Sequence, residues 1–210
     1  RWNVLVCHRR FGKTVCMINH LIRSALLSKQ KNPRYAYIAP TFKQAKSIAW
    51  DYMKQFTAKI PYTKFNETEL RVDLPNGSRI TLLGSENSDG LRGIYLDGCV
   101  IDEYANVNSK LFPEIIRPAL SDRKGYCVFI GTPAGMNNNF YELYQHAQGA
   151  EDWFNYKAKA SDTKIVDNDE LVKAKEVMGD KKFQQEFECD WIANIEGAVY
   201  SDVLGKMEDQ

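Results

Sequence analysis

The chain has 210 residues, of which 44% are hydrophobic and 26% are charged. This is the balance of an ordinary globular domain, so it excludes a fibrous or a wholly disordered protein, and the chain is long enough to bury a core without disulfides or metals. The formal net charge of +1 excludes a histone-like polycation, but it leaves room for a local basic strip that binds nucleic-acid phosphates.

The cysteines, the apolar runs and the first residues of the sequence indicate the cellular setting and the completeness of the chain. There are five cysteines, an odd number, and no two have CxxC spacing, which favours reduced and mostly buried thiols in the cytosol over disulfides or zinc. No apolar run approaches the roughly 20 residues of a membrane-spanning helix. Since Arg1 and Trp2 directly precede a strand-like run, we expect the sequence to be a piece of a longer chain.

Short apolar runs alternate with segments whose apolar residues recur at helical spacing. Thr41 suits the N-cap of a helix, and the Asn76-Gly77 pair is typical of a hairpin turn. Strands alternating with helices predict an α/β fold with a mostly parallel central sheet flanked by helices. The expected strands are residues 3–7, 35–39, 98–101 and 126–130, with a hairpin over 69–83. The expected helices are residues 13–27, 41 to about 56, 109–120, 138–148 and 170–178.

The clearest motif follows the first expected strand and opens the first expected helix. Residues 7–14 read CHRRFGKT, which fits the second half of the P-loop pattern G-x-x-x-x-G-K-[ST], with Cys7 at the first glycine position. In that pattern Gly12 allows a phosphate to approach the backbone closely, Lys13 reaches the β- and γ-phosphates, and the Thr14 hydroxyl binds magnesium. The motif predicts ATP and Mg²⁺ as ligands.

The remaining loop residues have a part in the same site. Backbone N–H groups from Arg10 and Phe11 onward would face the phosphates at the helix N-terminus. Two arginines inside a phosphate loop are unusual, and either Arg9 or Arg10 could stabilise charge on the γ-phosphate as an arginine finger does. The alternative is that an arginine points to solvent or pairs with an acid, and we expect at least one of the two to face solvent.

An apolar run ending in two acids, VIDEY at residues 100–104, has the form of a Walker B strand. Asp102 would hold magnesium through water, and Glu103 would orient and deprotonate the attacking water. Two acids at a strand end are common on protein surfaces. The P-loop makes the catalytic interpretation the stronger one, because each motif supplies what the other lacks.

Two further segments are weaker signals. Thr132 lies in Gly-Thr-Pro directly after a strand, where a polar residue can sense the γ-phosphate, although glycine and proline also simply end strands. Arg92 lies in the glycine-rich stretch GSENSDGLRG, from which it could serve a neighbouring subunit. The alternative is that Arg92 pairs with Glu86 or Asp89.

Taken together, these segments resemble the large terminase subunit of tailed double-stranded DNA bacteriophages, the motor ATPase of DNA packaging. The resemblance covers almost the whole chain in the family's order, and its second, third and last segments are far more specific than the P-loop and Walker B motifs. The segments are CHRRFGKT (7–14), YIAPTFKQAKSIAW (37–50), GSENSDGLRG (84–93), VIDEYA (100–105), GTPAG (131–135) and FQQEFECDWI (183–192).

The resemblance implies a P-loop NTPase fold of the ASCE type that hydrolyses ATP to move double-stranded viral DNA into a procapsid in the host cytoplasm. It implies that Arg9 acts within its own subunit, that Arg92 reaches the neighbour's ATP, and that Thr132 couples hydrolysis to movement. It also implies a portal protein, a small terminase subunit and further copies in a ring as partners, with no membrane involved. Candidate DNA contacts are Lys43, Lys46, Lys54, Arg71 and Arg79.

The sequence departs from the family pattern at several points, and these departures limit the activities that we expect of it. Cys7 replaces the first P-loop glycine, which this family often tolerates. The adenine-binding segment expected before the P-loop is largely missing, so ATP binding is expected to be weak. We expect an ATPase domain over residues 1–195 and the start of a linker over 196–210, which is too short for the family's nuclease domain. DNA cleavage is therefore not expected.

Two other classes of function stay open on the sequence. A helicase-like ATPase that remodels nucleic acid would share the same catalytic motifs, and only the terminase-like segments at 84–93 and 183–192 separate the two. A P-loop scaffold without catalysis is the third possibility. The intact catalytic residues argue against such a scaffold, namely Lys13, Thr14, Asp102 and Glu103.

Overall fold

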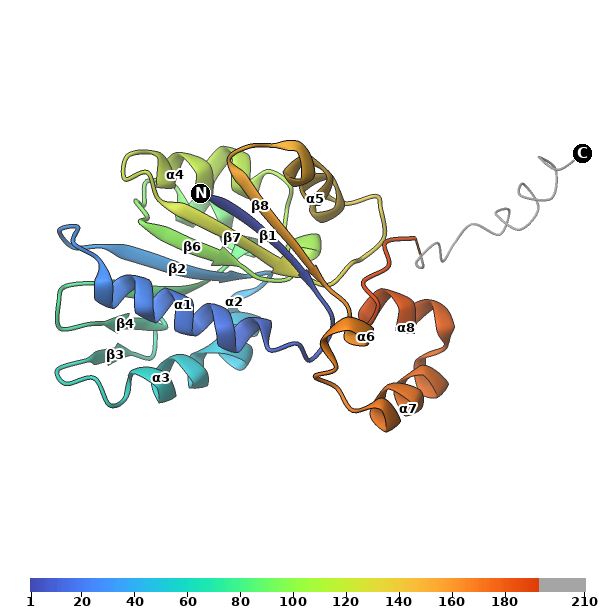
Figure 1. Ribbon diagram of the computed structural model, residues 1–210. Helices are drawn as coiled ribbons and strands as arrows, with labels where there is room; N and C mark the ends of the chain where they lie inside the picture. Colours follow the sequence, from blue (N-terminus) through green and yellow to red (C-terminus); the bar gives the residue numbers. More distant parts are fainter. Residues whose placement is uncertain (193–210) are drawn as a thin grey trace, which may run out of the picture.

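The computed structural model describes residues 1–192 and shows one eight-stranded sheet with helices on both faces (Figure 1). The strand order is β3-β4-β5-β2-β6-β7-β1-β8, and the six strands from β5 to β8 pair in parallel. The predicted α/β fold with a mostly parallel sheet is therefore confirmed. The strands are β1 (Trp2–Cys7), β2 (Arg34–Ala39), β3 (Lys64–Asn66), β4 (Arg71–Asp73), β5 (Arg79–Gly84), β6 (Gly98–Ile101), β7 (Tyr126–Gly131) and β8 (Trp153–Ala158).

The helices lie in two layers and one end group (Figure 1). α1, η1 and α3 pack on one face of the sheet, whereas η4, α4 and α5 pack on the other. α6, α7 and α8 gather beyond the carboxyl end of β1. The helices are α1 (Lys13–Leu27), α2 (Phe42–Ala45), η1 (Lys46–Trp50), α3 (Asp51–Thr57), η2 (Ser85–Leu91), η3 (Tyr104–Asn106), η4 (Leu111–Ile116), α4 (Arg117–Ser121), α5 (Asn139–Gly149), α6 (Ala160–Thr163), α7 (Asn168–Met178) and α8 (Asp180–Glu186).

Each central strand contributes side chains to both cores, as expected for a sheet covered on two sides. On β2, Tyr35 and Tyr37 pack against α1 and α3, while Ala36 and Ile38 face the layer of η4, α4 and α5. All four are buried. This two-sided burial explains why the central strands read as continuous apolar runs.

Two expected helices are present but are not regular α-helices throughout. The segment that begins after Thr41 runs on as α2, η1 and α3, and Thr41 forms a capping box with Gln44, as its N-cap assignment predicted. The segment expected at 109–120 begins as the π-helical turns of η4. Pro113 lies in that stretch and Pro118 opens α4, and proline removes a backbone donor from a helix.

Several elements were not predicted. β8 was missed because it is an edge strand that pairs with β1 in the described sheet, and its Phe154 and Tyr156 are exposed. The short elements β3, η3, α6 and α8 were also missed, and the stretch interpreted as a loop at 84–93 contains the 3₁₀ turns of η2. The proposed domain boundary near residue 195 lies outside the described residues. Within residues 1–192, none of the helices has both the length and the apolar character required to cross a bilayer.

The contact between Gly98 and Tyr126 yields a stability prediction. The two residues are cross-strand neighbours of β6 and β7, and a Cβ on Gly98 would overlap the tyrosine ring. That ring is held by a 3.0 Å hydrogen bond from its hydroxyl to Ser24 Oγ. We expect Gly98→Ala to lower the free energy of unfolding by about 1–3 kcal/mol, the usual cost of overpacking a core, as measured by urea denaturation.

The matched control is Gly149→Ala. Nothing lies within 4 Å of a Cβ built on Gly149, at the end of α5. Alanine there should leave stability unchanged or raise it slightly, because it forms helix better than glycine. If the two variants unfolded at the same urea concentration, the Tyr126 ring would not restrict the size of the side chain at position 98.

Candidate active site

The predicted site residues, with the exception of Arg92, meet at one edge of the sheet. β7 pairs with both β1 and β6, and parallel strands end on the same side, so the segments that follow these three strands lie together. A polar cavity of about 510 Å³ opens there. Its lining comprises Arg9, Arg10, Phe11, Gly12, Lys13, Thr14, Val15, Ile48, Tyr52, Glu103, Thr132 and Glu186.

The loop after β1 has the form that a phosphate-binding loop requires. Gly12 caps α1 with a φ of 89°, in the left-handed region that favours glycine. No atom lies within 4 Å of a Cβ built on it, so the space beside the backbone is open to a ligand. The Lys13 ammonium donates to the carbonyl oxygens of Cys7 and His8, at 3.0 Å each. The loop therefore closes around the lysine that would meet the phosphates.

His8 anchors this loop, a role that the sequence did not reveal. Its Nδ1 lies 2.7 Å from the Arg9 carbonyl oxygen, which can only accept, so Nδ1 carries the proton. Nε2 then accepts a hydrogen bond from the Thr163 hydroxyl of α6, at 2.8 Å. Burial lowers the pKa of His8, which favours this neutral form. His8 thus has a structural role in joining the loop to α6.

The two loop arginines differ in their surroundings. Arg9 donates its backbone N–H to the Glu186 carbonyl oxygen at 2.8 Å, and its guanidinium lies 3.9 Å from the Glu186 carboxylate. Its side chain is nevertheless 62% exposed. Arg10 is exposed and has a φ of 63°, a conformation that costs a non-glycine residue energy and is frequent at functional sites. The expectation that at least one arginine faces solvent is confirmed.

Asp102 is buried at the end of β6 and is held by three donors. Its Oδ1 accepts the Glu103 backbone N–H at 2.8 Å. Its Oδ2 accepts hydrogen bonds from the Tyr37 hydroxyl and, at 3.5 Å, from the Thr14 hydroxyl. Burial raises the pKa of Asp102, and the hydrogen bond from Tyr37 opposes that rise. Carboxylate and hydroxyl oxygens side by side are a donor set that fits magnesium.

Glu103 projects into the cavity from a left-handed backbone position, with a φ of 47°. Burial, together with the charge of Asp102, raises the pKa of Glu103 to about 7, and Lys13 opposes the rise. A carboxylate with a pKa near neutrality is well suited to accept a proton from water. The geometry and the electrostatics therefore both fit the role of general base predicted for Glu103.

The loop after β7 and helix α8 complete the wall. Thr132 lines the cavity, and the next residue, Pro133, accepts a 2.6 Å hydrogen bond from the buried Gln185 amide of α8. Phe183 and Phe187 recur at helical spacing in the sequence, and their rings stack with centroids 5.3 Å apart. That spacing could have revealed α8, although it could not reveal that α8 reaches the site.

Arg92 lies apart from this cavity. Among the residues that the structure describes, the cavity lining does not include it. Its guanidinium lies 3.9 Å from Glu114 and is 58% exposed. Of the two partners considered from the sequence, Glu86 instead accepts the Phe42 backbone N–H at 2.7 Å, and the Asp89 side chain lies outside the described part of the structure. Arg92 therefore stands apart from the predicted site residues that this cavity brings together.

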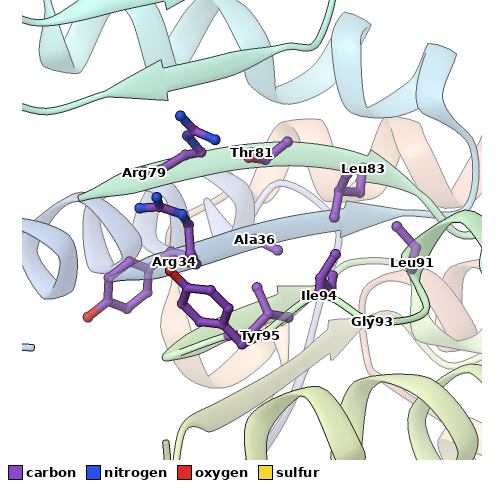
Figure 2. Close-up of a pocket in the computed structure, with 11 residues that line it drawn as sticks. Arg34, Ala36, Arg79, Thr81, Leu83, Leu91, Gly93, Ile94 and Tyr95 are labelled. Carbon is purple, nitrogen blue, oxygen red and sulfur yellow. The ribbon is translucent and has the colours of Figure 1, made fainter. Parts of the chain in front are cut away.

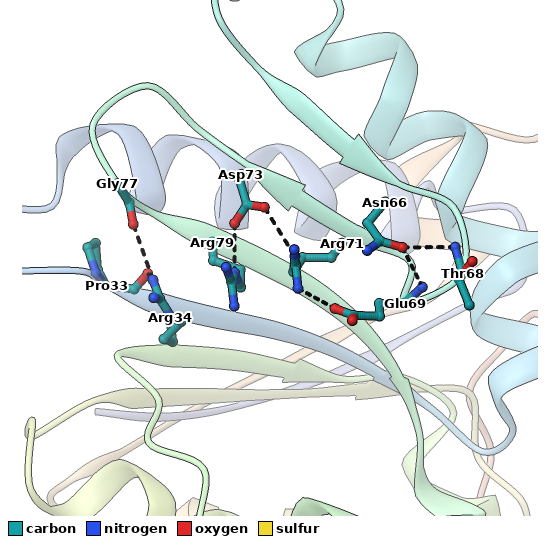
Figure 3. A network of polar contacts seen from close by, with 9 residues as sticks. All are labelled: Pro33, Arg34, Asn66, Thr68, Glu69, Arg71, Asp73, Gly77 and Arg79. Carbon is teal, nitrogen blue, oxygen red and sulfur yellow. Dashed lines mark hydrogen bonds and ion pairs between the residues drawn. The ribbon is translucent and has the colours of Figure 1, made fainter.

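The cations considered as DNA contacts fall into two groups. Lys43 and Lys46 are exposed on α2 and η1. The other three lie in ion pairs: Lys54 with Asp51 and Glu67, Arg71 with Glu69 and Asp73, and Arg79 with Asp73. Figure 3 shows Asp73 between the two arginines. Acids already offset these three charges, so Lys43 and Lys46 are the better candidates.

A second cavity, of about 330 Å³, lies over β2 and β5 beside the segment at 91–96 (Figure 2). Arg34 and Arg79 stand at its edge, but Arg34 donates to the carbonyl oxygens of Pro33 and Gly77 at 3.1 Å each. Arg79 donates to Asp73 at 2.7 Å. With both guanidinium groups engaged, this cavity shows no arrangement comparable to the site at the ends of β1, β6 and β7.

Solved structures of phage large terminases have the same fold. The large terminase ATPase domain of Thermus phage P74-26 superposes with a TM-score of 0.75 at 21% identity, covering 91% of this chain and 88% of that one. The large terminase of another thermophilic bacteriophage, solved in complex with ADP, gives a TM-score of 0.75 at 15% identity, covering 90% of this chain and 48% of that one.

Sequence relatives lead to the same family. The large terminase subunits of Thermus phage G20c and Thermus virus P23-45 are each 29% identical over 126 residues, so the match spans 51% of this chain but only 26% of each relative. The profile described as "Terminase large subunit, T4likevirus-type, N-terminal" matches residues 6–202. With its P-loop, its paired acids and its sheet order in place, the chain belongs to this terminase large-subunit family.

Proposed function

We propose that this chain is the ATP-hydrolysing motor domain of a phage terminase and drives double-stranded DNA into a procapsid. The observation that carries the proposal is the meeting of Lys13, Thr14, Glu103 and Thr132 around one polar cavity. The buried Asp102 adjoins them and accepts a 3.5 Å hydrogen bond from the Thr14 hydroxyl. Segments far apart in sequence supply the groups that ATP hydrolysis needs. The family membership adds DNA packaging as the use to which the hydrolysis is put.

The residues present fit magnesium and ATP. The N–H groups of the loop from Arg10 to Thr14 would bind the phosphates at the start of α1, and Lys13 would exchange its two carbonyl partners for phosphate oxygens. Thr14 and Asp102 would hold Mg²⁺, which when bound neutralises phosphate charge. One terminase of the same fold was solved with ADP, which supports a nucleotide as the ligand of this cavity.

Hydrolysis would then depend on three groups at the open side of the cavity. Glu103 would take a proton from the attacking water. Arg9 is close enough to the cavity to place positive charge beside the γ-phosphate from the same subunit. Thr132 would sense whether that phosphate is present, and the loop after β7 would pass the change to α8 through the hydrogen bond that Gln185 donates to Pro133.

The partners of the motor follow from the same proposal. Double-stranded DNA would be the substrate that moves, a portal protein and a procapsid would receive it, and a small terminase subunit would help to select it. Further copies of this chain would complete a ring in the host cytoplasm. Lys43 and Lys46, both exposed, are the described cations that we assign to DNA phosphates, and such contacts weaken steeply as salt rises.

Replacement of Lys13 tests the phosphate site. Lys13→Ala should abolish ATP turnover, because the β- and γ-phosphates lose their fixed cation. In a complete large subunit that carries this chain, DNA protected from nuclease by procapsids should be lost as well. The control is Lys29→Ala, an exposed lysine just beyond the other end of α1. Turnover of Lys13→Ala within a few-fold of this control would refute the P-loop assignment.

Replacement of Glu103 tests whether ATP binding can be separated from ATP hydrolysis. Glu103→Gln keeps the size of the side chain but cannot accept a proton, so ATP should still bind while turnover falls by about 10²–10⁴-fold. Binding of a fluorescent ATP analogue and phosphate release measure the two effects. Glu170→Gln, an exposed change on α7, should alter neither. If the Glu103→Gln protein hydrolyses ATP at the control rate, another group is the base.

Arg92 is proposed to act in the neighbouring subunit's site, because it does not line the cavity of its own. An arginine finger can raise turnover by about 10³–10⁵-fold, so Arg92→Ala should hydrolyse ATP poorly. Mixing Arg92→Ala with Glu103→Gln in the complete subunit should restore part of the activity. Some interfaces then pair the intact Glu103 of one subunit with the intact Arg92 of the next.

The same mixture distinguishes the other roles. If Arg92 acts within its own subunit, neither variant completes a site and the mixture stays inactive. If Arg92 serves only to pair with Glu114, from which it lies 3.9 Å away, Arg92→Ala should lose thermal stability while the folded protein keeps its turnover. Measuring turnover and melting temperature on the same samples separates these outcomes.

A further inference from the structure

Tyr37 is a fully buried tyrosine beside the proposed metal site. It lies in the middle of β2, where it pairs in register with Val100 of β6, and its side chain is 0% exposed. Its hydroxyl reaches along β6 and donates to Asp102 Oδ2. A buried phenol must find a hydrogen-bond partner, and here that partner is the carboxylate expected to hold magnesium.

The backbone fixes this contact from both sides. Asp102 donates its backbone N–H to the carbonyl oxygen of Ile38, the residue after Tyr37, at 2.8 Å. Asp102 Oδ1 accepts the Glu103 N–H. Each carboxylate oxygen therefore has its own donor, one from the backbone and one from the Tyr37 hydroxyl. Removing the hydroxyl would leave only the 3.5 Å contact with Thr14 on Oδ2.

We propose that Tyr37 is a positioning residue for the magnesium site, whose hydroxyl fixes the orientation of the Asp102 carboxylate toward Thr14. The proposal rests on the proposed function, because it presumes that Thr14 and Asp102 hold Mg²⁺ with a nucleotide. Groups that hydrogen-bond to metal ligands orient those ligands, and losing such a group typically costs about 10–100-fold in metal affinity or activity. A tyrosine that only filled the core would need no hydroxyl.

β2 itself offers a matched control. Tyr35 lies two residues before Tyr37, faces the same core and is also buried, but its hydroxyl donates to the Ser24 carbonyl oxygen of α1 at 3.1 Å. Tyr35→Phe and Tyr37→Phe thus remove the same atom from the same strand face. They differ in that only Tyr37 contacts Asp102.

The test measures binding of a fluorescent ATP analogue to a complete large subunit that carries this chain, with excess Mg²⁺ and with excess EDTA. The ratio of the two affinities reports how strongly the metal favours nucleotide binding. Tyr37→Phe should reduce this ratio by about 10-fold and leave the affinity in EDTA unchanged, since Lys13 and the loop amides are intact. Tyr35→Phe should behave as the unaltered chain.

The outcomes separate the proposal from the function on which it rests. If the unaltered chain shows no gain from Mg²⁺, the magnesium assignment fails and the proposal fails with it. If Mg²⁺ raises the nucleotide affinity of the unaltered protein and of Tyr37→Phe by the same factor, only the role of Tyr37 is overturned. A loss of affinity in EDTA as well would mean that the hydroxyl serves the fold, which also overturns the proposal.

A double variant asks whether Tyr37 acts through Asp102. In Asp102→Asn the residue to be oriented is already impaired, so adding Tyr37→Phe should reduce the Mg²⁺ effect no further. Residues in one hydrogen-bond network give such non-additive changes, whereas independent residues add. If the double variant lost a further factor of about 10 in the effect of Mg²⁺ on nucleotide affinity, Tyr37 would not act through Asp102.

Discussion

The parallel pairing of β6, β7 and β1 is the constraint on which the site depends. Because the three strands run in one direction, their carboxyl ends share one edge of the sheet, and Asp102, Thr132 and Lys13 emerge there from segments separated by many residues. β7 lies between the other two strands, which puts its terminal loop between the phosphate loop and the paired acids. The chemistry thus follows from strand order, and the helices on both faces hold that order in place.

Burial of charge at this edge has a second consequence. A carboxylate that leaves water must find donors, and Asp102 takes them from Glu103, Tyr37 and Thr14. Glu103 responds to burial differently, because its pKa is raised to about 7 by desolvation and by the adjacent Asp102 charge. Burial therefore suits the two neighbouring acids to different proposed tasks, Asp102 to holding the metal and Glu103 to accepting a proton.

The sequence was sufficient to predict the elements that are marked by a pattern of neighbouring residues. Helix α1 was predicted with its observed bounds, the Thr41 cap was correct, and the P-loop and the paired acids were recognisable from strand, turn and helix order. β8 and α8 were missed because an exposed edge strand and a short helix carry weak periodicity. Tyr37, His8 and Gln185 could not be assigned roles, because each acts through a contact 52 or more residues away.

Several of these distant contacts converge on helix α8. Its Glu186 backbone carbonyl and carboxylate contact Arg9 in the phosphate loop, while the preceding Gln185 holds Pro133 next to Thr132. His8 adds a third contact, to Thr163 of α6. The phosphate loop and the loop after β7 are therefore both attached to the same short helix. Since α6, α7 and α8 pack around one small core of their own, both loops are attached to a single packed unit of three helices.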